Sequence, residues 1–155
     1  MPAETPEIIK VICASSWSIV REGIITVLKK RGDIHFIGEA ENGEELLTKV
    51  KDLLPDVVIT DITLKIKNGY EFVPEISKNY PGIKIIILSM YNDPAVITKM
   101  IELGAHSYLI SSDSGADEIY TAIVQCHKNT FYFSEVVNNA ITKICLQRKT
   151  AQKNK

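Results

Sequence analysis

The sequence predicts an α/β fold built on a doubly wound sheet of parallel strands. Short strand-like runs alternate with segments in which apolar residues recur at helical spacing. Three of the runs are almost continuously apolar, which is typical of strands that helices cover on both faces. Turn-forming residues separate the segments, and this regular alternation favours consecutive βα units over any all-α or all-β arrangement.

Five runs are predicted to be strands because they are short, rich in β-branched residues and bounded by Gly, Pro, Asp or Ser. They are IIKVIC (8–13), IHFIGE (34–39), DVVIT (56–60), IKIIIL (83–88) and SYLI (107–110). The helices between them have recognisable first turns. Asn42 with Glu45 three residues later predicts one N-cap, and Asp93 before Pro94 predicts another.

The chain organises into one domain with short extensions. We expect residues 1–7 to be an N-terminal extension and residues 8–133 to form the domain. Ser134 is predicted to cap an extra helix over 134–146, whose apolar side needs a partner. The polar, basic tail that follows is expected to be a frayed, solvated end. Residues 134–155 are therefore interpreted as a linker or an interaction segment.

Composition narrows the class of protein. The chain has 155 residues, of which 45% are hydrophobic and 24% charged, an ordinary globular balance. A net charge of −1 does not favour binding to nucleic acid or to a membrane surface. The three cysteines lack metal-binding spacing, and no leader-like or membrane-spanning apolar run occurs. We expect a soluble, cytoplasmic protein with free thiols.

Position singles out one acidic residue. Ligands of open parallel sheets bind beyond the carboxyl ends of the strands. The segments expected there are 14–17, 61–68, 89–92 and 111–114. Asp61 follows a buried strand directly, and its carboxylate could be a nucleophile, a metal ligand or a cap on the next loop. Position alone leaves these three roles open.

Several motifs resemble those of bacterial response-regulator receiver domains. In PDVVITDITLKIKNGYEF, Gly69 lies eight residues after Asp61, as a glycine does after the phosphoacceptor aspartate of that family. IVREGI, GEAENGEELL, IIILSMYNDP and LGAHSYLI are similar to receivers of the NarL/FixJ-type subfamily. The resemblance spans Ile8 to Phe133. It implies a flavodoxin-like (βα)5 fold with strand order 2-1-3-4-5, plus an extra C-terminal helix.

The resemblance also implies a signalling mechanism rather than an enzyme. In receivers of two-component phosphorelays, an aspartate takes a phosphoryl group from a phosphohistidine of a sensor histidine kinase. Two acids after the first strand help to hold Mg²⁺, which prefers carboxylates and waters. A lysine after the fifth strand contacts the phosphoryl oxygens. A hydroxyl after the fourth strand and an aromatic residue in the fifth strand respond to the phosphoryl group.

Four residues match this pattern. By resemblance, Asp61 occupies the phosphoacceptor position, and Thr63 could offer its backbone carbonyl to a weakly bound Mg²⁺. Ser89 occupies the position of the switch hydroxyl, and Tyr108 that of the switch aromatic residue.

Other positions depart from the pattern. The acidic pair falls on Ser15 and Ser16, and the lysine falls on Ser111. Lys65 stands where the family commonly has proline and could approach the pocket. Trp17 is bulky enough to cover part of the pocket mouth. Because three charged partners are missing, we expect a degenerate phosphorylation pocket, no resident metal or other cofactor, and inefficient phosphorylation of Asp61.

The first functional hypothesis is an atypical receiver that regulates through protein–protein contact. Its partner, or a second copy of the chain, would bind the face formed by residues 94–128 or the 134–146 helix. The alternative is a phospho-accepting receiver of a DNA-binding transcriptional regulator whose helix-turn-helix domain is absent from this chain. An enzyme of the phosphatase or flavin-binding type is disfavoured, because position 63 is Thr and no glycine-rich phosphate loop follows the first strand.

Overall fold

The computed structural model describes residues 6–128 and 131–154. Its elements are β1 (Ile9–Ala14), α1 (Ser18–Leu28), β2 (Ile34–Ala40), α2 (Gly43–Leu53), β3 (Val57–Thr60), α3 (Gly69–Asn79), β4 (Lys84–Ser89), α4 (Pro94–Leu103), β5 (Ser107–Ile110), α5 (Ala116–His127), β6 (Tyr132–Phe133) and α6 (Glu135–Lys153). The strands pair in parallel in the order β2-β1-β3-β4-β5-β6. The predicted fold and strand order are confirmed, and each predicted strand lies within one residue of its observed bounds.

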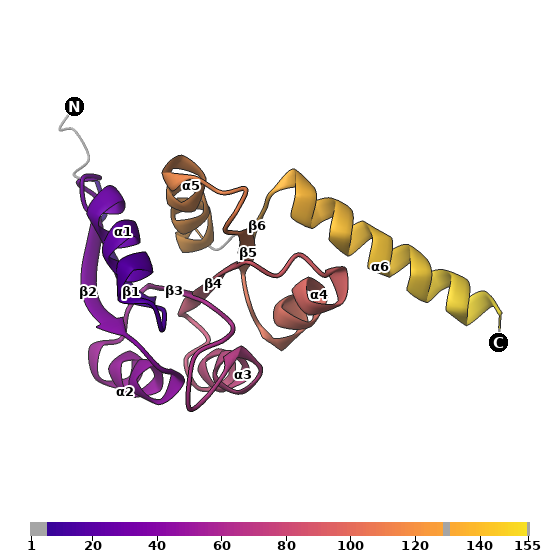
Figure 1. Cartoon of the computed structure of the whole chain (residues 1–155), viewed down its shortest axis with the longest axis horizontal. Coiled ribbons are helices and arrows are strands. Elements are labelled where there is room, and N and C mark those ends of the chain that lie inside the picture. The colour runs from indigo at the N-terminus through magenta and orange to yellow at the C-terminus, as the bar shows by residue number, and fades with distance from the viewer. Residues whose placement is uncertain (1–5, 129–130, 155) are drawn as a thin grey trace.

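Helices cover both faces of the sheet. Figure 1 shows α1 and α5 on one face and α2, α3 and α4 on the other. Two clusters of buried side chains fill the spaces between these layers. Alternate residues of β3 enter different clusters: Val57 and Ile59 face the α1–α5 side, and Val58 faces the other side. This double burial explains why the strand is a continuous apolar run in the sequence.

The predicted helix caps are present. The Asn42 side chain accepts a hydrogen bond from the Glu45 amide at 2.8 Å, and Asp93 accepts one from Ala95 at 2.8 Å. Ser134 accepts one from the Val137 amide at 3.4 Å, so α6 begins where the sequence predicted. Side-chain acceptors at these positions satisfy amides that no helical carbonyl reaches.

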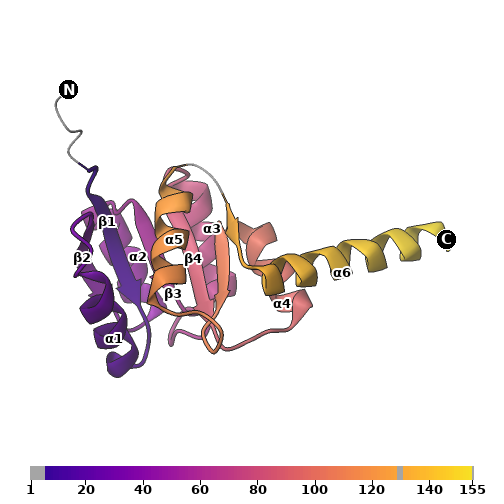
Figure 2. The same ribbon diagram turned by 90° about the horizontal axis from the view of Figure 1, so that it is seen from above.

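The C-terminal region differs from the expectation in two ways. A sixth strand, β6, extends the sheet, and Tyr108 pairs with Phe133 across it. The helix α6 runs to Lys153, where a frayed tail was expected. It packs on α4, its Val137 is buried in the core, and Arg148 forms an ion pair with Glu102 at 2.7 Å. Figure 2 shows α6 leaving the body beside α4.

The start of α2 is held against the loop that follows Asp61. The Gly43 amide donates to the Lys65 carbonyl at 3.0 Å. A Cβ atom at Gly43 would lie 1.9 Å from the Lys67 carbonyl oxygen, so no other residue fits without moving the backbone. Ile66, between these two lysines, has a φ of 71°, a region that a β-branched residue rarely adopts. The α2 contact thus helps to fix a strained loop.

The close approach at Gly43 gives a matched pair of glycine substitutions. We expect Gly43→Ala to lower the free energy of unfolding by about 1–3 kcal/mol, because the new methyl group overlaps backbone. Gly23, exposed in α1, is the control, because a Cβ atom added there would meet no other atom within 4 Å. Gly23→Ala should raise stability by roughly 0.5–1 kcal/mol through helix propensity. Urea unfolding of both variants measures the difference; equal effects would contradict the packing argument.

His106 predicts a pH dependence of stability. Its Nδ1 accepts a hydrogen bond from the Ile85 amide at 3.2 Å, and its ring stacks on Phe131. Burial, with the nearby charge of Lys84, lowers the pKa of His106 to about 4. Below the ordinary histidine pKa of about 6.5, His106 binds a proton in the unfolded chain but stays neutral in the folded chain. The contribution of His106 to the free energy of unfolding is therefore fully present above about pH 6.5 and declines as the pH falls toward about 4.

The His106→Asn variant tests this dependence, because an amide oxygen can replace Nδ1 as acceptor without titrating. We expect the variant to lose less stability than the native chain between about pH 6.5 and 4. Chemical denaturation at several pH values gives the two slopes. His35→Asn, the same substitution at an exposed position of β2, is the matched control. Identical slopes for all three proteins would refute the assignment.

Among the described residues, no helix has the length and apolar character needed to cross a membrane.

Candidate functional site

A cavity of about 130 Å³ opens beside Asp61, where β1, β3, β4 and β5 end. Most of the side chains that line it are apolar. The lining residues are Ala14, Ser15, Trp17, Val20, Ile24, Ile59, Thr60, Asp61, Leu88, Met90 and Ser111. The structure therefore brings together Asp61 and three of the other residues singled out from the sequence, Ser15, Trp17 and Ser111.

Asp61 is half-buried and tied to its own loop. Its Oδ1 accepts a hydrogen bond from the Ile62 amide at 2.7 Å, and its Oδ2 accepts one from the Thr63 hydroxyl at 3.1 Å. Within residues 6–128 and 131–154, no lysine or arginine forms an ion pair with this carboxylate. The carboxylate keeps lone pairs for a ligand, because it can accept about four hydrogen bonds.

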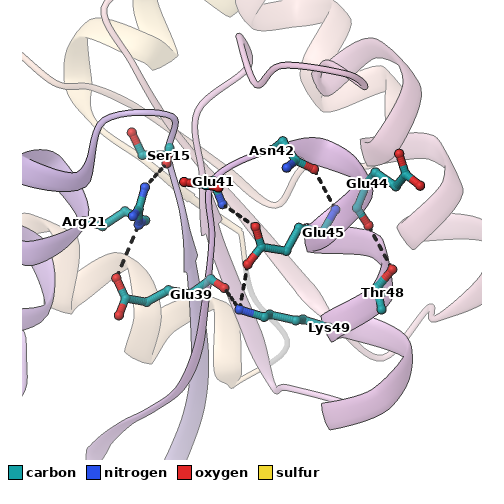
Figure 3. Close-up of polar contacts among 9 residues, drawn as sticks. All are labelled: Ser15, Arg21, Glu39, Glu41, Asn42, Glu44, Glu45, Thr48 and Lys49. Carbon is teal, nitrogen blue, oxygen red and sulfur yellow. Dashed lines mark hydrogen bonds and ion pairs between the residues drawn. The ribbon is translucent and has the colours of Figure 1, made fainter.

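The turn after β1 is held by neutral and cationic donors. Ser15 is buried, and its Oγ accepts a hydrogen bond from the Trp17 amide at 3.2 Å. Arg21 of α1 donates to the Ser15 carbonyl at 2.5 Å and to the Glu39 carboxylate at 3.3 Å, as Figure 3 shows. The hydroxyl of Ser16 is buried and has no hydrogen-bond partner within the described part of the chain.

Ser89, Tyr108 and Ser111 are connected through the backbone. The Ser111 amide donates to the Ser89 carbonyl at 2.8 Å, and the Ser89 hydroxyl accepts from the Tyr91 amide at 3.2 Å. Tyr108 is fully buried, and its hydroxyl donates to the Tyr91 carbonyl at 2.7 Å. Burial raises the pKa of Tyr108 to about 12, so its phenol stays protonated at neutral pH. These contacts link the cavity edge to the centre of β5.

Five of the nine site residues predicted from the sequence lie outside the cavity lining: Ser16, Thr63, Lys65, Ser89 and Tyr108. Thr63 is exposed and contacts the site only through its hydrogen bond to Asp61. Lys65 is also exposed, and its backbone carbonyl is engaged by Gly43 at the start of α2. Trp17 lines the cavity while 68% of its surface remains exposed.

Sequence reasoning missed four apolar lining residues, Val20, Ile24, Ile59 and Leu88. Val20 and Ile24 belong to a helix, and apolar residues at helical spacing are usually interpreted as core. Ile59 and Leu88 lie within apolar strands, which are also interpreted as core. Met90, by contrast, lies in the 89–92 segment that was expected beyond the carboxyl end of a strand.

The donors around Asp61 do not fit Mg²⁺. This ion prefers octahedral coordination by carboxylates and waters and gives up its waters reluctantly. Asp61 supplies one carboxylate, and Ser15 and Ser16, which stand at the positions that the family resemblance assigns to two acids, are neutral. No cluster of three or more His, Cys, Asp or Glu side chains that could hold a metal occurs among the described residues.

Comparison with known sequences shows the class of protein. The profile of the response regulator receiver domain matches residues 11–123. The chain therefore belongs to the response-regulator receiver family, a class of signalling modules, and the resemblance inferred from its motifs is confirmed at this level.

Particular relatives are regulators. The chain is 37% identical over 119 residues to the transcriptional regulatory protein LnrK of Bacillus subtilis, covering 77% of this chain and 54% of LnrK. It is 29% identical over 129 residues to the response regulator protein VraR of Staphylococcus saprophyticus, covering 83% of this chain and 61% of VraR. The chain thus spans about half the length of the curated relatives that it matches.

Solved structures agree with the fold. The signal receiver domain of NarL from Mycobacterium tuberculosis has 27% identity and a TM-score of 0.75, with 79% of this chain and 98% of that chain covered. A LuxR-family response regulator from Aurantimonas has 24% identity and a TM-score of 0.84, with 90% of this chain and 99% of that chain covered. Because its identity is only 24%, the similarity to the Aurantimonas regulator supports the fold alone.

The two adjacent serines of the β1 turn give opposite predictions. Ser15→Ala should lower the free energy of unfolding by about 0.5–1.5 kcal/mol, because the Trp17 amide loses its acceptor. Ser16→Ala should be neutral or stabilising by up to about 1 kcal/mol, because it removes a buried hydroxyl that makes no hydrogen bond. Urea unfolding of the two variants measures both effects. A larger loss for Ser16→Ala than for Ser15→Ala would contradict the hydrogen-bond assignment.

Proposed function

We propose that this receiver is the regulatory part of a transcriptional regulator and that its input is not efficient Mg²⁺-dependent phosphorylation of Asp61. The observation that carries the proposal is the single carboxylate at a cavity that is otherwise apolar and hydroxyl-lined. The relatives support the regulatory part, since LnrK is named a transcriptional regulatory protein. Contact with DNA would belong to a part of the protein outside these 155 residues.

Phosphorylation of Asp61 depends on the charged groups around it. Phosphoryl transfer depends on positioning and on neutralising charge that develops on the transferred group. Around Asp61, serines 15, 16 and 111 stand at the positions that the family resemblance assigns to two acids and a lysine. Removal of one preorganised electrostatic group from an active site commonly slows a reaction about 10²–10³-fold. Three such losses would leave Asp61 a very slow acceptor, although such effects are not strictly additive.

The second candidate is a conventional phospho-accepting receiver of a DNA-binding regulator. The comparisons favour this candidate over the atypical one, because VraR and the other relatives carry the names of response regulators and transcriptional regulators. Asp61, Ser89 and Tyr108 occupy family positions and also support it. In this case a sensor histidine kinase would be the partner that supplies the phosphoryl group.

The packing of α6 bears on protein partners. We propose contact with a protein or with a second copy of the chain through residues 94–128 or through α6. Ile97 and Met100 of α4 are buried in the core, and α6 packs against the same helix. A partner that used α4 would therefore have to displace α6 or bind beside it. Val136 and Leu146 of α6 remain exposed and would be available to it.

Phosphorylation can be tested by gain of function. The native chain, incubated with Mg²⁺ and acetyl phosphate, should show little phosphoryl adduct by intact mass. The triple variant Ser15→Asp, Ser16→Asp, Ser111→Lys should show a stoichiometric adduct that chelation of Mg²⁺ or a further Asp61→Asn change abolishes. The turn can accept Ser15→Asp, since a carboxylate can replace the serine hydroxyl as acceptor for the Trp17 amide.

A matched control places the new lysine one residue farther along. Ser112 is exposed and does not line the cavity, so Ser112→Lys in place of Ser111→Lys should restore less adduct. If the native chain itself becomes stoichiometrically phosphorylated, and Asp61→Asn prevents this, the second candidate is correct and the first is wrong.

A further inference from the structure

The cavity beside Asp61 has the size and lining of a small-molecule site. Its volume is about 130 Å³. An engineered cavity of about 150 Å³ in another protein binds benzene, so this space suits one six-membered ring. Ala14, Val20, Ile24, Ile59 and Leu88 supply its apolar walls. Such walls favour an apolar body over a hydrated ion.

The polar groups of the cavity favour a cationic end on that body. Asp61 is the one charged side chain among the described residues that line it. Two hydrogen bonds from Ile62 and Thr63 leave part of its acceptor capacity unused. An ammonium group, with three donors and a positive charge, complements this carboxylate. An anion such as a carboxylate or phosphate would meet a like charge and no cation among these lining residues.

The cavity mouth carries two apolar side chains in contact with water. Trp17 is 68% exposed and Met90 is 84% exposed, and both line the cavity. A bound molecule would remove part of this surface from water, which is favourable. Trp17 can also interact with a cation through its ring. Its indole, the only one in the chain, reports directly on occupancy of the cavity.

We propose that the cavity binds a small primary amine with a single-ring apolar body, with the ammonium group on Asp61 and the ring among Val20, Ile24 and Leu88. The inference deepens the proposed function and rests on it, since it supplies a ligand input where a phosphoryl group would otherwise act. Binding is non-covalent and requires no metal.

The test titrates the full 155-residue chain with benzylamine and follows Trp17 fluorescence. Amide shifts of Ile62 and Ser111 in two-dimensional NMR give a second, independent reading. We expect saturable binding with a dissociation constant of about 1 mM or tighter. Benzyl alcohol, of the same shape without charge, should bind about tenfold more weakly, and benzoate weaker still. In Asp61→Asn the difference between the amine and the alcohol should disappear.

A matched pair on α1 locates the site. Val20 and Val27 are 42% and 46% exposed, but only Val20 lines the cavity. Val20→Phe should weaken benzylamine binding about tenfold or more by filling the space, while Val27→Phe should leave it unchanged. Circular dichroism and thermal unfolding check that each variant is folded. If Val20→Phe does not fold, Val20→Leu replaces it as the cavity-filling variant.

Three outcomes would overturn the inference: no saturable binding up to about 10 mM amine, equal affinity for amine, alcohol and benzoate, or equal affinity in the native and filled variants. The acetyl phosphate experiment is separate and contains no amine. Phosphorylation of native Asp61 would refute the proposed function without changing the result of the benzylamine titration. Failure of the proposed function and failure of the ligand proposal are therefore distinguishable.

Discussion

Burial of β3 on both faces is the constraint on which the site depends. All four residues from Val57 to Thr60 are buried, and the strand pairs in register with β1 and β4. Because Thr60 pairs with Ala14, the residues that follow, Asp61 and Ser15, emerge side by side. The position of Asp61 is therefore set by apolar packing far more than by any polar contact of its own.

The turn after β1 is stabilised by hydrogen bonds to Ser15. The Ser15 amide donates to the Ala40 carbonyl at 3.0 Å, its hydroxyl accepts from Trp17, and Arg21 binds its carbonyl. Arg21 is held in turn by Glu39 on β2. Ser15, Ser16 and Trp17 of this turn have uncharged side chains, and apolar side chains from α1 and β4 line the neighbouring cavity. Among the described residues that line the cavity beside this turn, Asp61 is the one charged side chain.

Sequence patterns were sufficient to predict strands and helix starts wherever local sequence rules agreed with burial in the structure. Continuous apolar runs predicted β3 and β4, and the Asn42, Asp93 and Ser134 caps began helices where side-chain acceptors were expected. Strand β6 was not predicted, because a strand of two residues has no periodicity to detect. The full length of α6 was not predicted, because the sequence of its polar C-terminal part is typical of a solvated tail. The contact that supports it, between Arg148 and Glu102, joins residues far apart in the chain.

By itself, the sequence determined the fold, the family and the residue types that stand at the carboxyl ends of the strands. It could do so because strand burial, helix caps and family motifs are local and repeat along the chain. The cavity beside Asp61, the hydrogen bonds that occupy its carboxylate and the packing of α6 on α4 were decided by tertiary structure alone. Each depends on the space left between side chains of separate elements, and no pattern along one segment measures that space.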